Sequence, residues 1–307
     1  MKELWTEKYR PRRVSEYVFR DNAQKKLVMS WINDKSIPHL LLSGTQGIGK
    51  TTLSKVLLTE IGIPDFDILE VNASRETGID FIRETIVPFI SMIPFGPFKV
   101  VILDEADRLS QQGQDSLKGI IEEYTSHARF ILTCNTPSRI LPPLHSRLQQ
   151  QHFSAIDQTE FTARAATVLV NEGIEFDLDT LDLYVKAVYP DLRKCLNLLQ
   201  QNSTDGVLVS PNQSDSGITD YKIDMVSLFK QGKITEARIL LCAKARPDEM
   251  ESIYRWMYDN LELFGNDDET KDQALLIIKQ GLVDHAFIAD PEINLAATLV
   301  KLARLQH

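Results

Sequence analysis

The segment from Gly44 to Thr51 reads Gly-Thr-Gln-Gly-Ile-Gly-Lys-Thr, a full match to the phosphate-loop pattern GxxxxGK[ST]. An apolar run at 39–43 precedes it, and a segment with helical patterning at 50–61 follows it. In this strand–loop–helix context, glycines let backbone N–H groups curl around a phosphate, and the new helix adds its favourable dipole. The segment therefore predicts an α/β domain that binds a nucleotide.

The residues of this loop have distinct predicted roles. Lys50 supplies positive charge for the outer phosphates, and the Thr51 hydroxyl is a predicted ligand of Mg²⁺. We therefore expect ATP and Mg²⁺ as cofactors. The alternative is a glycine-rich turn that matches the pattern by chance. The predicted nucleotide-binding residues of the loop are Gly44, Thr45, Gln46, Gly47, Ile48, Gly49, Lys50, Thr51 and Thr52.

Charge is distributed unevenly along the 307 residues. Residues 1–155 hold 19 basic and 18 acidic residues, a net charge of +1, while the remainder holds 15 basic and 25 acidic residues, a net charge of −10. The overall charge of −9 argues against a protein that coats DNA through general basicity. Any nucleic-acid contact should therefore come from a local patch in the first half.

Targeting signals are not evident. No apolar stretch approaches the length of a membrane span, and the N-terminus lacks a signal-peptide core, so we expect no membrane partner. The lack of a basic localisation run favours the cytoplasm of a prokaryotic or phage-infected cell over a nucleus. Cys134, Cys195 and Cys242 lie far apart without metal-ligand spacing, which predicts buried thiols.

Strand-like and helix-like segments alternate in the first half of the chain, which predicts a parallel sheet with helices on both faces. From about residue 157 the patterning is helical, and the polar stretch 203–220 reads as a loop. We expect domains at 1–155, 156–212 and 213–307. The predicted strands are 39–43, 66–71, 99–103, 129–134 and a weaker candidate at 148–153. The predicted helices are 50–61, 78–92, 112–124, 157–171, 178–187, 191–202 and four or five more within 221–307.

A second motif follows the third predicted strand, where the apolar run 100–103 ends in Asp104-Glu105-Ala-Asp107. Asp104 is a predicted Mg²⁺ ligand, and Glu105 is a predicted general base for the attacking water. One strand–helix unit separates this motif from the phosphate loop, so we expect the two on adjacent strands. An acidic strand end without a ligand is the alternative. A helicase of the Asp-Glu-Ala-Asp type would need a second ATPase-like domain, which the helical pattern after 157 does not provide.

Three further polar residues are candidates for the catalytic site. Asn135 follows the fourth predicted strand, where its amide can orient the lytic water. Arg147 follows a proline-rich turn, and nothing local pairs with it, so we expect it to project and complete a neighbouring subunit's site in trans. Arg193 opens a helix and can reach back to the triphosphate. The alternatives are a turn-forming asparagine and two solvent-exposed arginines.

Taken in order, these elements resemble the small ATPase subunits of sliding-clamp loaders. The chain is similar to replication factor C small subunits and their phage counterparts, within the AAA+ superfamily. The resemblance covers residues 1–200. It departs from the cellular pattern inside the phosphate loop, at Leu148 and at Pro190. The segments that carry it are 7–11, 38–44, 71–74, 104–107, 133–135, 146–147 and 191–193.

The resemblance implies an α/β P-loop AAA+ domain with a five-stranded parallel sheet, a helical lid, and an all-α C-terminal collar. It implies an ATPase stimulated by DNA and by the clamp, with Tyr9, Arg10 and Pro11 lining the adenine pocket. The implied partners are a sliding clamp, a larger loader subunit, primer–template DNA, and further copies of the chain in a pentameric ring or spiral.

The resemblance also implies two partner surfaces. DNA contacts fall on helix N-termini, here Ser74, Arg75, Thr77 and Gly78, with Arg83 and Gln114 as weaker candidates. The clamp contact falls on a helix end and the loop after it, at Phe89, Met92, Ile93 and Phe95, where packing in the core is the open alternative.

Two other functions remain to be weighed. Another oligomeric AAA+ DNA motor, for branch migration or helicase loading, would typically carry an appended DNA-binding domain, and residues 221–307 are not basic enough for one. A non-hydrolysing scaffold subunit of a loader disagrees with the intact Lys50, Thr51, Asp104 and Glu105.

Overall fold

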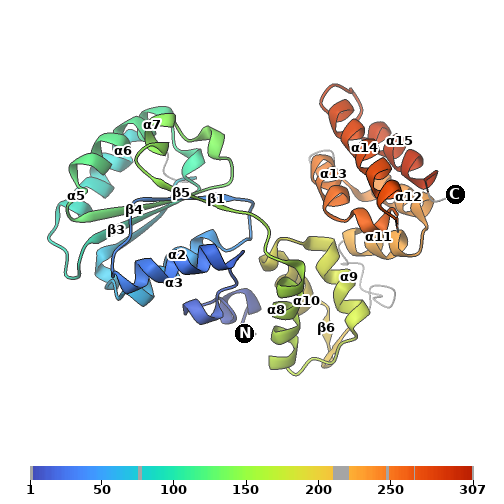
Figure 1. The fold of residues 1–307 in the computed structure, drawn as a ribbon, viewed down its shortest axis with the longest axis horizontal. Coiled ribbons are helices and arrows are strands. Elements are labelled where there is room, and N and C mark those ends of the chain that lie inside the picture. The colour runs from blue at the N-terminus through green and yellow to red at the C-terminus, as the bar shows by residue number, and fades with distance from the viewer. Residues whose placement is uncertain (1–2, 75–77, 210–220, 247–248, 266, 306–307) are drawn as a thin grey trace. The chain divides into compact units, whose positions relative to one another are not determined.

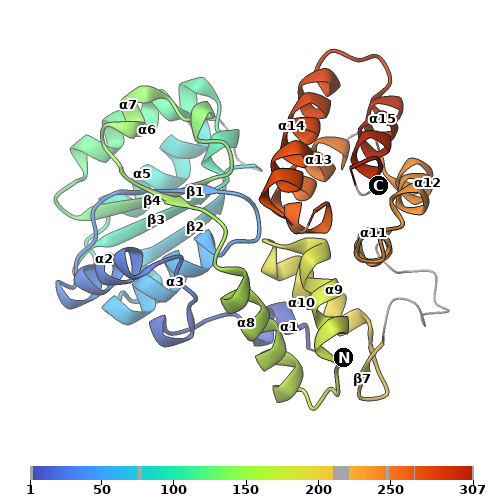
Figure 2. The same cartoon turned by 45° about the vertical axis from the view of Figure 1, so that its right-hand side comes forward.

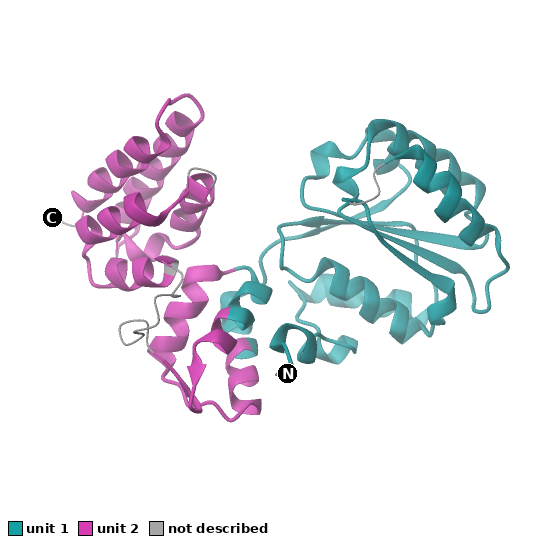
Figure 3. Ribbon diagram, turned by 180° about the vertical axis from the view of Figure 1, so that it is seen from behind, with its two compact units in different colours: residues 1–164, 190–197 teal, residues 165–189, 198–307 magenta. Residues whose placement is uncertain are grey.

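The computed structural model describes residues 3–74, 78–209, 221–246, 249–265 and 267–305. The chain divides into two compact units, residues 1–164 with 190–197 and residues 165–189 with 198–307 (Figure 3). Helices α8 (Gln158–Asn171) and α10 (Leu192–Gln201) each begin in the first unit and end in the second. The three-domain division at 155 and 212 stays a prediction, and residue 212 lies outside the described residues.

The first unit is built on a five-stranded sheet in the order β2-β3-β4-β1-β5, with every neighbouring pair parallel. This confirms the predicted sheet, including the weak fifth strand. Its strands run over Leu40–Gly44 (β1), Ile68–Asn72 (β2), Lys99–Asp104 (β3), Ala128–Cys134 (β4) and Gln149–Phe153 (β5).

The predicted adjacency of the phosphate loop and the acidic motif is wrong, because β4 lies between β1 and β3. The chain leaves β1, enters the sheet at its β2 edge, and then adds β3 and β4 until β4 pairs with β1. Spacing along the sequence identifies strands but does not fix their lateral order. As a result, β4 contacts both motif-bearing strands.

Helices cover both faces of the sheet, as Figures 1 and 2 show. Leu40 and Leu42 of β1 pack with α2 and α3 on one face, whereas Leu41 packs with α5 and α6 on the other, as side-chain alternation in a strand requires. The helices of this unit are α1 (Trp5–Lys8), α2 (Asn22–Asn33), α3 (Lys50–Ile61), α4 (Ile79–Phe81), α5 (Val87–Ser91), α6 (Gln111–Glu123) and α7 (Pro142–His145), with short 3₁₀ turns at Val14–Glu16, Asp65–Asp67, Ala106–Arg108 and Pro137–Arg139.

The segment predicted as one helix over 78–92 contains a π-helical turn at Ile82–Ile86, between α4 and α5. Pro88 follows this turn. Because proline has no N–H and its ring clashes with the carbonyl four residues earlier, a widened turn is a natural way to continue the helix. Ile82, Ile86 and Ile90 still point into the core on one face.

The second unit is mostly helical. Its helices are α9 (Leu178–Val188), α11 (Tyr221–Lys230), α12 (Ile234–Lys244), α13 (Met250–Asp259), α14 (Asp268–His285) and α15 (Pro291–Ala303), with a 3₁₀ turn at Leu261–Leu263. The described residues after 220 form five helices, in agreement with the predicted four or five. Trp256 of α13 donates to the Lys186 carbonyl of α9 at 2.6 Å, so α9 and α13 are tied together within this unit.

The segment predicted as a loop over 203–220 begins with a small hairpin. Strands β6 (Ser203–Thr204) and β7 (Val207–Leu208) pair antiparallel around Asp205 and Gly206, both at positive φ. An Asp-Gly pair is the usual signal of a two-residue hairpin turn. The sequence therefore contained the signal for this hairpin.

The cysteines follow the prediction in two cases. Cys134 and Cys195 are buried, whereas Cys242 is only partly buried. Burial raises the pKa of the Cys134 thiol to about 11, helped by the nearby Asp107 carboxylate. Cys134 is thus a neutral packing residue near neutral pH.

His39 is a buried histidine directly before β1 and is held neutral. The Phe130 backbone N–H donates to its Nδ1 at 3.2 Å, which leaves the proton on Nε2, 3.3 Å from the Thr125 hydroxyl. Burial, with the Arg129 charge as a smaller cause, lowers the pKa of His39 to about 4. Protonation would break the bond from Phe130, since a charged ring has no acceptor nitrogen.

We expect this histidine to make the first unit acid-sensitive. The unfolded chain binds the proton below pH 6.5 and the folded chain only near pH 4, so stability is lost as pH falls between these values. When the pH falls from 7.5 to 5.0, the free energy of unfolding of the wild type should decrease by about 2 kcal/mol more than that of His39→Asn, whose amide does not titrate. Urea denaturation of both proteins measures this difference, and an equal loss in both would contradict it.

Candidate active site

The phosphate loop joins the carboxyl end of β1 to the first residue of α3. Gly47 and Gly49 have φ values of +79° and +92°, a conformation that side-chain-bearing residues rarely adopt. A Cβ on Gly47 would lie 2.1 Å from the Asp191 Oδ1 carboxylate oxygen, so the loop needs glycine there for space as well. The phosphate loop therefore has glycine at the positions where its backbone conformation requires it.

Lys50 lies buried at the centre of the site. Its ammonium donates to the Gly44 carbonyl at 2.9 Å, the Thr45 carbonyl at 2.7 Å and the Asn135 side-chain oxygen at 2.9 Å. Burial lowers the pKa of Lys50, and the Asp104 carboxylate partly opposes this shift. Lys50 and Asn135, 85 residues apart, are therefore brought together as the sequence predicted.

Thr51 and Asp104 meet at the same edge, where the Thr51 hydroxyl donates to Asp104 Oδ1 at 2.8 Å. A hydroxyl and a carboxylate are hard oxygen donors of the kind that Mg²⁺ takes from protein, with nucleotide phosphates and water supplying the rest. Among the described residues there is no cluster of three or more acidic, histidine or cysteine ligands. These two residues therefore fit the predicted Mg²⁺ site.

Glu105 follows directly and has an unusual backbone. Its φ of 56° and ψ of 43° are left-handed values, which are uncommon for a residue with a side chain. Its amide donates to the Thr133 hydroxyl at 3.2 Å, and its carbonyl accepts from Arg108 at 2.9 Å. Such backbone strain tends to be retained at functional sites, in keeping with the predicted catalytic role.

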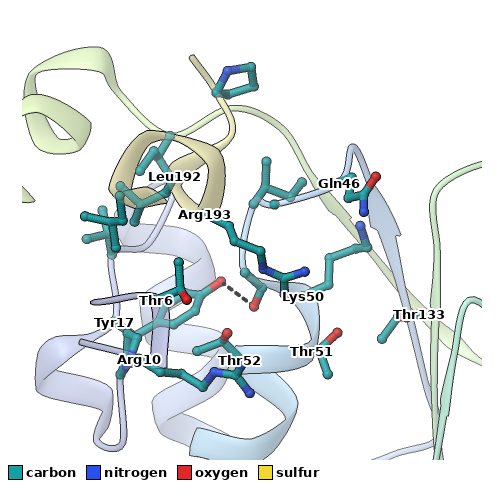
Figure 4. A pocket seen from close by; sticks show the side chains of 18 of the residues that line it. Thr6, Arg10, Tyr17, Gln46, Lys50, Thr51, Thr52, Thr133, Leu192 and Arg193 are labelled. Carbon is teal, nitrogen blue, oxygen red and sulfur yellow. Dashed lines mark hydrogen bonds between the residues drawn. The ribbon is translucent and has the colours of Figure 1, made fainter. Parts of the chain in front are cut away.

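One pocket gathers these residues, and Figure 4 shows Lys50, Thr51, Thr133 and Arg193 around it. Arg193 lies at the start of α10, whose N-terminus is capped by Asp191 through a bond from the Lys194 amide at 2.9 Å. Every predicted catalytic residue except Arg147 lines this pocket. So do the predicted nucleotide-binding residues Tyr9, Arg10, Pro11, Gln46, Gly47, Ile48, Gly49, Thr51 and Thr52. Gly44 and Thr45 do not line it and instead contact Lys50 through their carbonyls.

Several lining residues were missed from the sequence. Tyr17 donates to the Gly49 carbonyl at 3.4 Å and covers the phosphate loop, and burial raises the pKa of its hydroxyl. Arg164 donates to the Tyr9 carbonyl at 3.0 Å, which fixes the N-terminal segment. No local motif marks these contacts, because each joins segments distant in sequence. The other missed lining residues are Thr6, Glu16, Val18, Thr133, Cys134, Ile156, Pro190, Leu192 and Leu196.

The expectation that nothing local pairs with Arg147 is wrong. Its guanidinium forms an ion pair with Glu122, in which Nε donates to Oε1 at 2.7 Å, and it also donates to the Pro143 carbonyl at 2.6 Å. Glu122 stands near the end of α6, and only the folded chain brings it to Arg147. The pair is partly exposed, so it contributes little to stability.

The predicted DNA-contact residues have different surroundings. Ser74, Gly78 and Arg83 are exposed, although the Ser74 amide is already bonded to the Asn72 side chain at 2.8 Å. Gln114 is wrong as a DNA contact, because it is buried and its amide group bonds to the Leu109 and Arg139 carbonyls and the Leu141 amide. Arg75 and Thr77 lie outside the described residues.

An apolar surface lies at the amino ends of β2 and β3, away from the pocket. Met92, Ile93 and Phe95 are 59%, 89% and 83% exposed, so they are not core residues, whereas Phe89 is half-buried against the core. Phe66, which the sequence analysis missed, is 79% exposed, with its ring 6.2 Å from that of Phe95. We call Phe66, Met92, Ile93 and Phe95 the apolar edge patch.

A buried ion pair supports this patch. Asp67 and Lys99 are both buried, with 3.0 Å between Oδ1 and Nζ. Asp67 also accepts from the Gly96 amide at 2.6 Å, and the Lys99 ammonium lies 4.6 Å from the centre of the Phe89 ring. The pair thus ties the segment before β2 to the loop before β3.

Comparison with known proteins gives consistent matches. Residues 40–155 match the family model described as ATPase family associated with various cellular activities (AAA). A replication factor C small subunit of Sulfurisphaera tokodaii is 35% identical over 98% of this chain and 95% of its own length. That of Methanococcus vannielii is 32% identical over 100% of both chains.

Solved structures show the same fold. The Thermotoga maritima RuvB Holliday junction branch migration motor matches with a TM-score of 0.57 at 17% identity, over 72% of this chain and 79% of that one. At such low identity the likeness concerns the fold alone. Among the described residues, no helix has the length and apolarity needed to cross a membrane.

We expect Gly47→Ala to weaken ATP binding by more than about tenfold, because the new Cβ would collide with the Asp191 carboxylate and displace the loop. Gly62→Ala is the matched control, since Gly62 also has a positive φ of 85° but open space around its Cβ position. Both changes should cost about 1 kcal/mol of stability through backbone strain. Titration with a fluorescent nucleotide compares them, and equal affinities would refute the role of the contact with Asp191.

Proposed function

Because the chain belongs to the replication factor C small-subunit family, we propose that it acts as an ATPase subunit of a sliding-clamp loader. In this role ATP binding and hydrolysis serve to open the clamp and place it on primer–template DNA. The observation that carries the proposal is the convergence of Lys50, Thr51, Asp104, Glu105 and Asn135 on one pocket. We also propose a cytoplasmic location in a prokaryotic or phage-infected cell.

The other candidate functions have less support. Likeness to a branch-migration motor is a likeness of fold, which many activities share. A non-hydrolysing scaffold has no need of a general base, yet Glu105 lines the pocket beside Asp104. We therefore retain the clamp-loader ATPase as the single candidate.

Different residues of the pocket carry out different parts of ATP hydrolysis. Lys50 turns its ammonium from its carbonyl partners to the outer phosphates, and Asn135 orients the attacking water. Glu105 accepts the proton from that water as it attacks. Mg²⁺ held by Thr51 and Asp104 would neutralise charge on the phosphate oxygens. Arg193 contacts the triphosphate from α10 and so relates the start of this helix to the nucleotide state.

Arg147 is proposed to act on the nucleotide of a neighbouring copy. It precedes β5, which runs parallel to β1 with Gln149 beside Leu40, so it stands at the amino edge of the sheet. The phosphate loop leaves the opposite edge, one strand of five residues away, or roughly 16 Å. This separation supports action in trans within a pentameric ring or spiral that includes a larger subunit. The partly exposed pair with Glu122 is weak enough to be exchanged for a phosphate.

For primer–template DNA, we propose contacts through Ser74, Gly78 and Arg83, which lie beyond the carboxyl end of β2. Backbone amides and a single arginine would contact phosphates without reading sequence. Several copies along a duplex can add modest patches together, which reconciles DNA binding with an acidic chain.

For the clamp, we propose the apolar edge patch as the docking surface. It combines the predicted Met92, Ile93 and Phe95 with Phe66, whereas Phe89 supports the patch from its half-buried position. Exposed aromatic and aliphatic side chains of this kind serve as anchors in protein interfaces. The buried Asp67–Lys99 pair holds the two segments in one arrangement, which lowers the entropy cost of docking.

ATP turnover by the assembled loader tests this function. We expect primed DNA and the clamp together to raise ATP turnover on the order of tenfold, because binding of both would complete the arrangement of subunits that is competent for hydrolysis. Phe95→Ser and Phe66→Ser should keep the basal rate but weaken clamp affinity by roughly tenfold or more, through loss of an apolar anchor.

Leu178→Ser, which removes a 71% exposed leucine from the second unit, is the matched control and should behave as wild type. Turnover raised by DNA alone would instead indicate a motor, and no turnover in any mixture would indicate a scaffold. Unchanged clamp affinity in both Phe variants would reject the docking surface while leaving the ATPase role intact.

A further inference from the structure

Thr133 is a buried residue of β4 that lies beside the acidic end of β3. The register of the two strands pairs Leu103 with Leu132, so the next residues, Asp104 and Thr133, are neighbours. Thr133 is 1% exposed and lines the pocket, although the sequence analysis assigned it no role within the segment 133–135. Its position on the central strand brings it within reach of both acidic residues.

The Thr133 hydroxyl makes two bonds with opposite roles. It donates its proton to Asp104 Oδ1 and accepts the Glu105 backbone N–H at 3.2 Å. A hydroxyl has one proton and two lone pairs, so a single group can serve both residues at once. A valine of the same shape could do neither.

The two bonds hold different parts of Asp104 and Glu105, the side chain of the first and the backbone of the second. The bond to Asp104 fixes the orientation of the carboxylate that also accepts from Thr51. The bond from Glu105 secures the N–H of a residue in the left-handed region, where the backbone needs support from its surroundings. Thr51 stands at the start of a helix beside the loop, whereas Thr133 is built into the sheet.

We infer that Thr133 is a positioning residue for hydrolysis. Its single hydroxyl fixes the Mg²⁺-binding carboxylate of Asp104 and the backbone of Glu105 relative to each other. This inference rests on the proposed ATPase function. It assigns the role to the hydroxyl alone, and neither the methyl group nor the bulk of the side chain takes part. Groups behind metal ligands commonly change metal affinity or activity by 10- to 100-fold when removed.

Two variants separate the hydroxyl from the packing. Thr133→Val keeps the shape and removes the hydroxyl, whereas Thr133→Ser keeps the hydroxyl and removes a buried methyl group. We expect Thr133→Val to lower kcat by roughly 10- to 100-fold with little change in KM, and Thr133→Ser to stay within about threefold of wild type. If Thr133 served only to pack the core, Thr133→Ser would instead lower kcat more than Thr133→Val.

A second readout does not depend on turnover. The binding of fluorescent ADP is titrated with Mg²⁺, and we expect Thr133→Val to raise the half-saturating Mg²⁺ concentration by roughly tenfold while binding without Mg²⁺ is unchanged. Melting temperatures confirm folding, and Thr133→Ala replaces the valine variant if that one misfolds.

A normal Mg²⁺ response in Thr133→Val, or an equal defect in Thr133→Ser, would overturn the inference. If the wild type itself shows no turnover in any assembly, the proposed function fails, and the Mg²⁺ titration alone then decides the role of Thr133.

Discussion

The carboxyl edge of a parallel sheet is the constraint on which this molecule depends. Because β1, β3 and β4 run in the same direction, their last residues meet at one edge. Lys50 there bonds to Asn135, and Asp104 accepts from both Thr51 and Thr133. Each bond joins residues at least 29 positions apart, so the site exists only when the sheet is assembled.

The central position of β4 explains why the site is so closely connected. A strand between β1 and β3 can touch the phosphate loop with Asn135 and the acidic motif with Thr133. The phosphate loop and the acidic motif are therefore both bonded to residues within or directly after the same strand. Beyond β4, Asp107 accepts from the Thr136 amide, so the turn after this strand is tied to the acidic motif as well.

The amino edge of the same sheet carries groups of a different kind. Arg147 with its partner Glu122, and the apolar edge patch with the Asp67–Lys99 pair below it, all lie before the strands begin. Neither feature can serve the chain's own nucleotide, since the full length of the strands intervenes. This division agrees with the proposal that the chain hydrolyses ATP at one edge of the sheet and contacts other subunits at the opposite edge.

Local patterns in the sequence predicted the elements well. Alternating apolar runs marked all five strands, and the Gly-rich pattern and the acids after β3 marked Lys50, Thr51, Asp104 and Glu105. Motif order also identified Asn135 and Arg193, which line the same pocket.

Pairing between distant segments was not predictable in the same way. The lateral order of strands depends on how crossovers pack, so the predicted adjacency of β1 and β3 failed. Thr133 and Phe66 each have their important neighbour in a segment that is distant in sequence. Gln114 was a candidate DNA contact from the sequence, and only the fold shows the three backbone groups that bond to its side chain. The Glu122–Arg147 pair needs α6 and the turn before β5 to meet, which no spacing along the chain reports.

The central claim is that hydrolysis occurs at a seam shared by two copies, and mixing two inactive variants tests it most directly. Lys50→Ala removes the phosphate contact of its own pocket, and Arg147→Ala removes the group offered to the neighbour. In an equal mixture, about a quarter of the seams between copies should combine an intact pocket with an intact arginine and recover turnover in proportion. If Arg147→Ala alone retains full turnover, or the mixture is no more active than its parts, the seam is not shared and the account is contradicted.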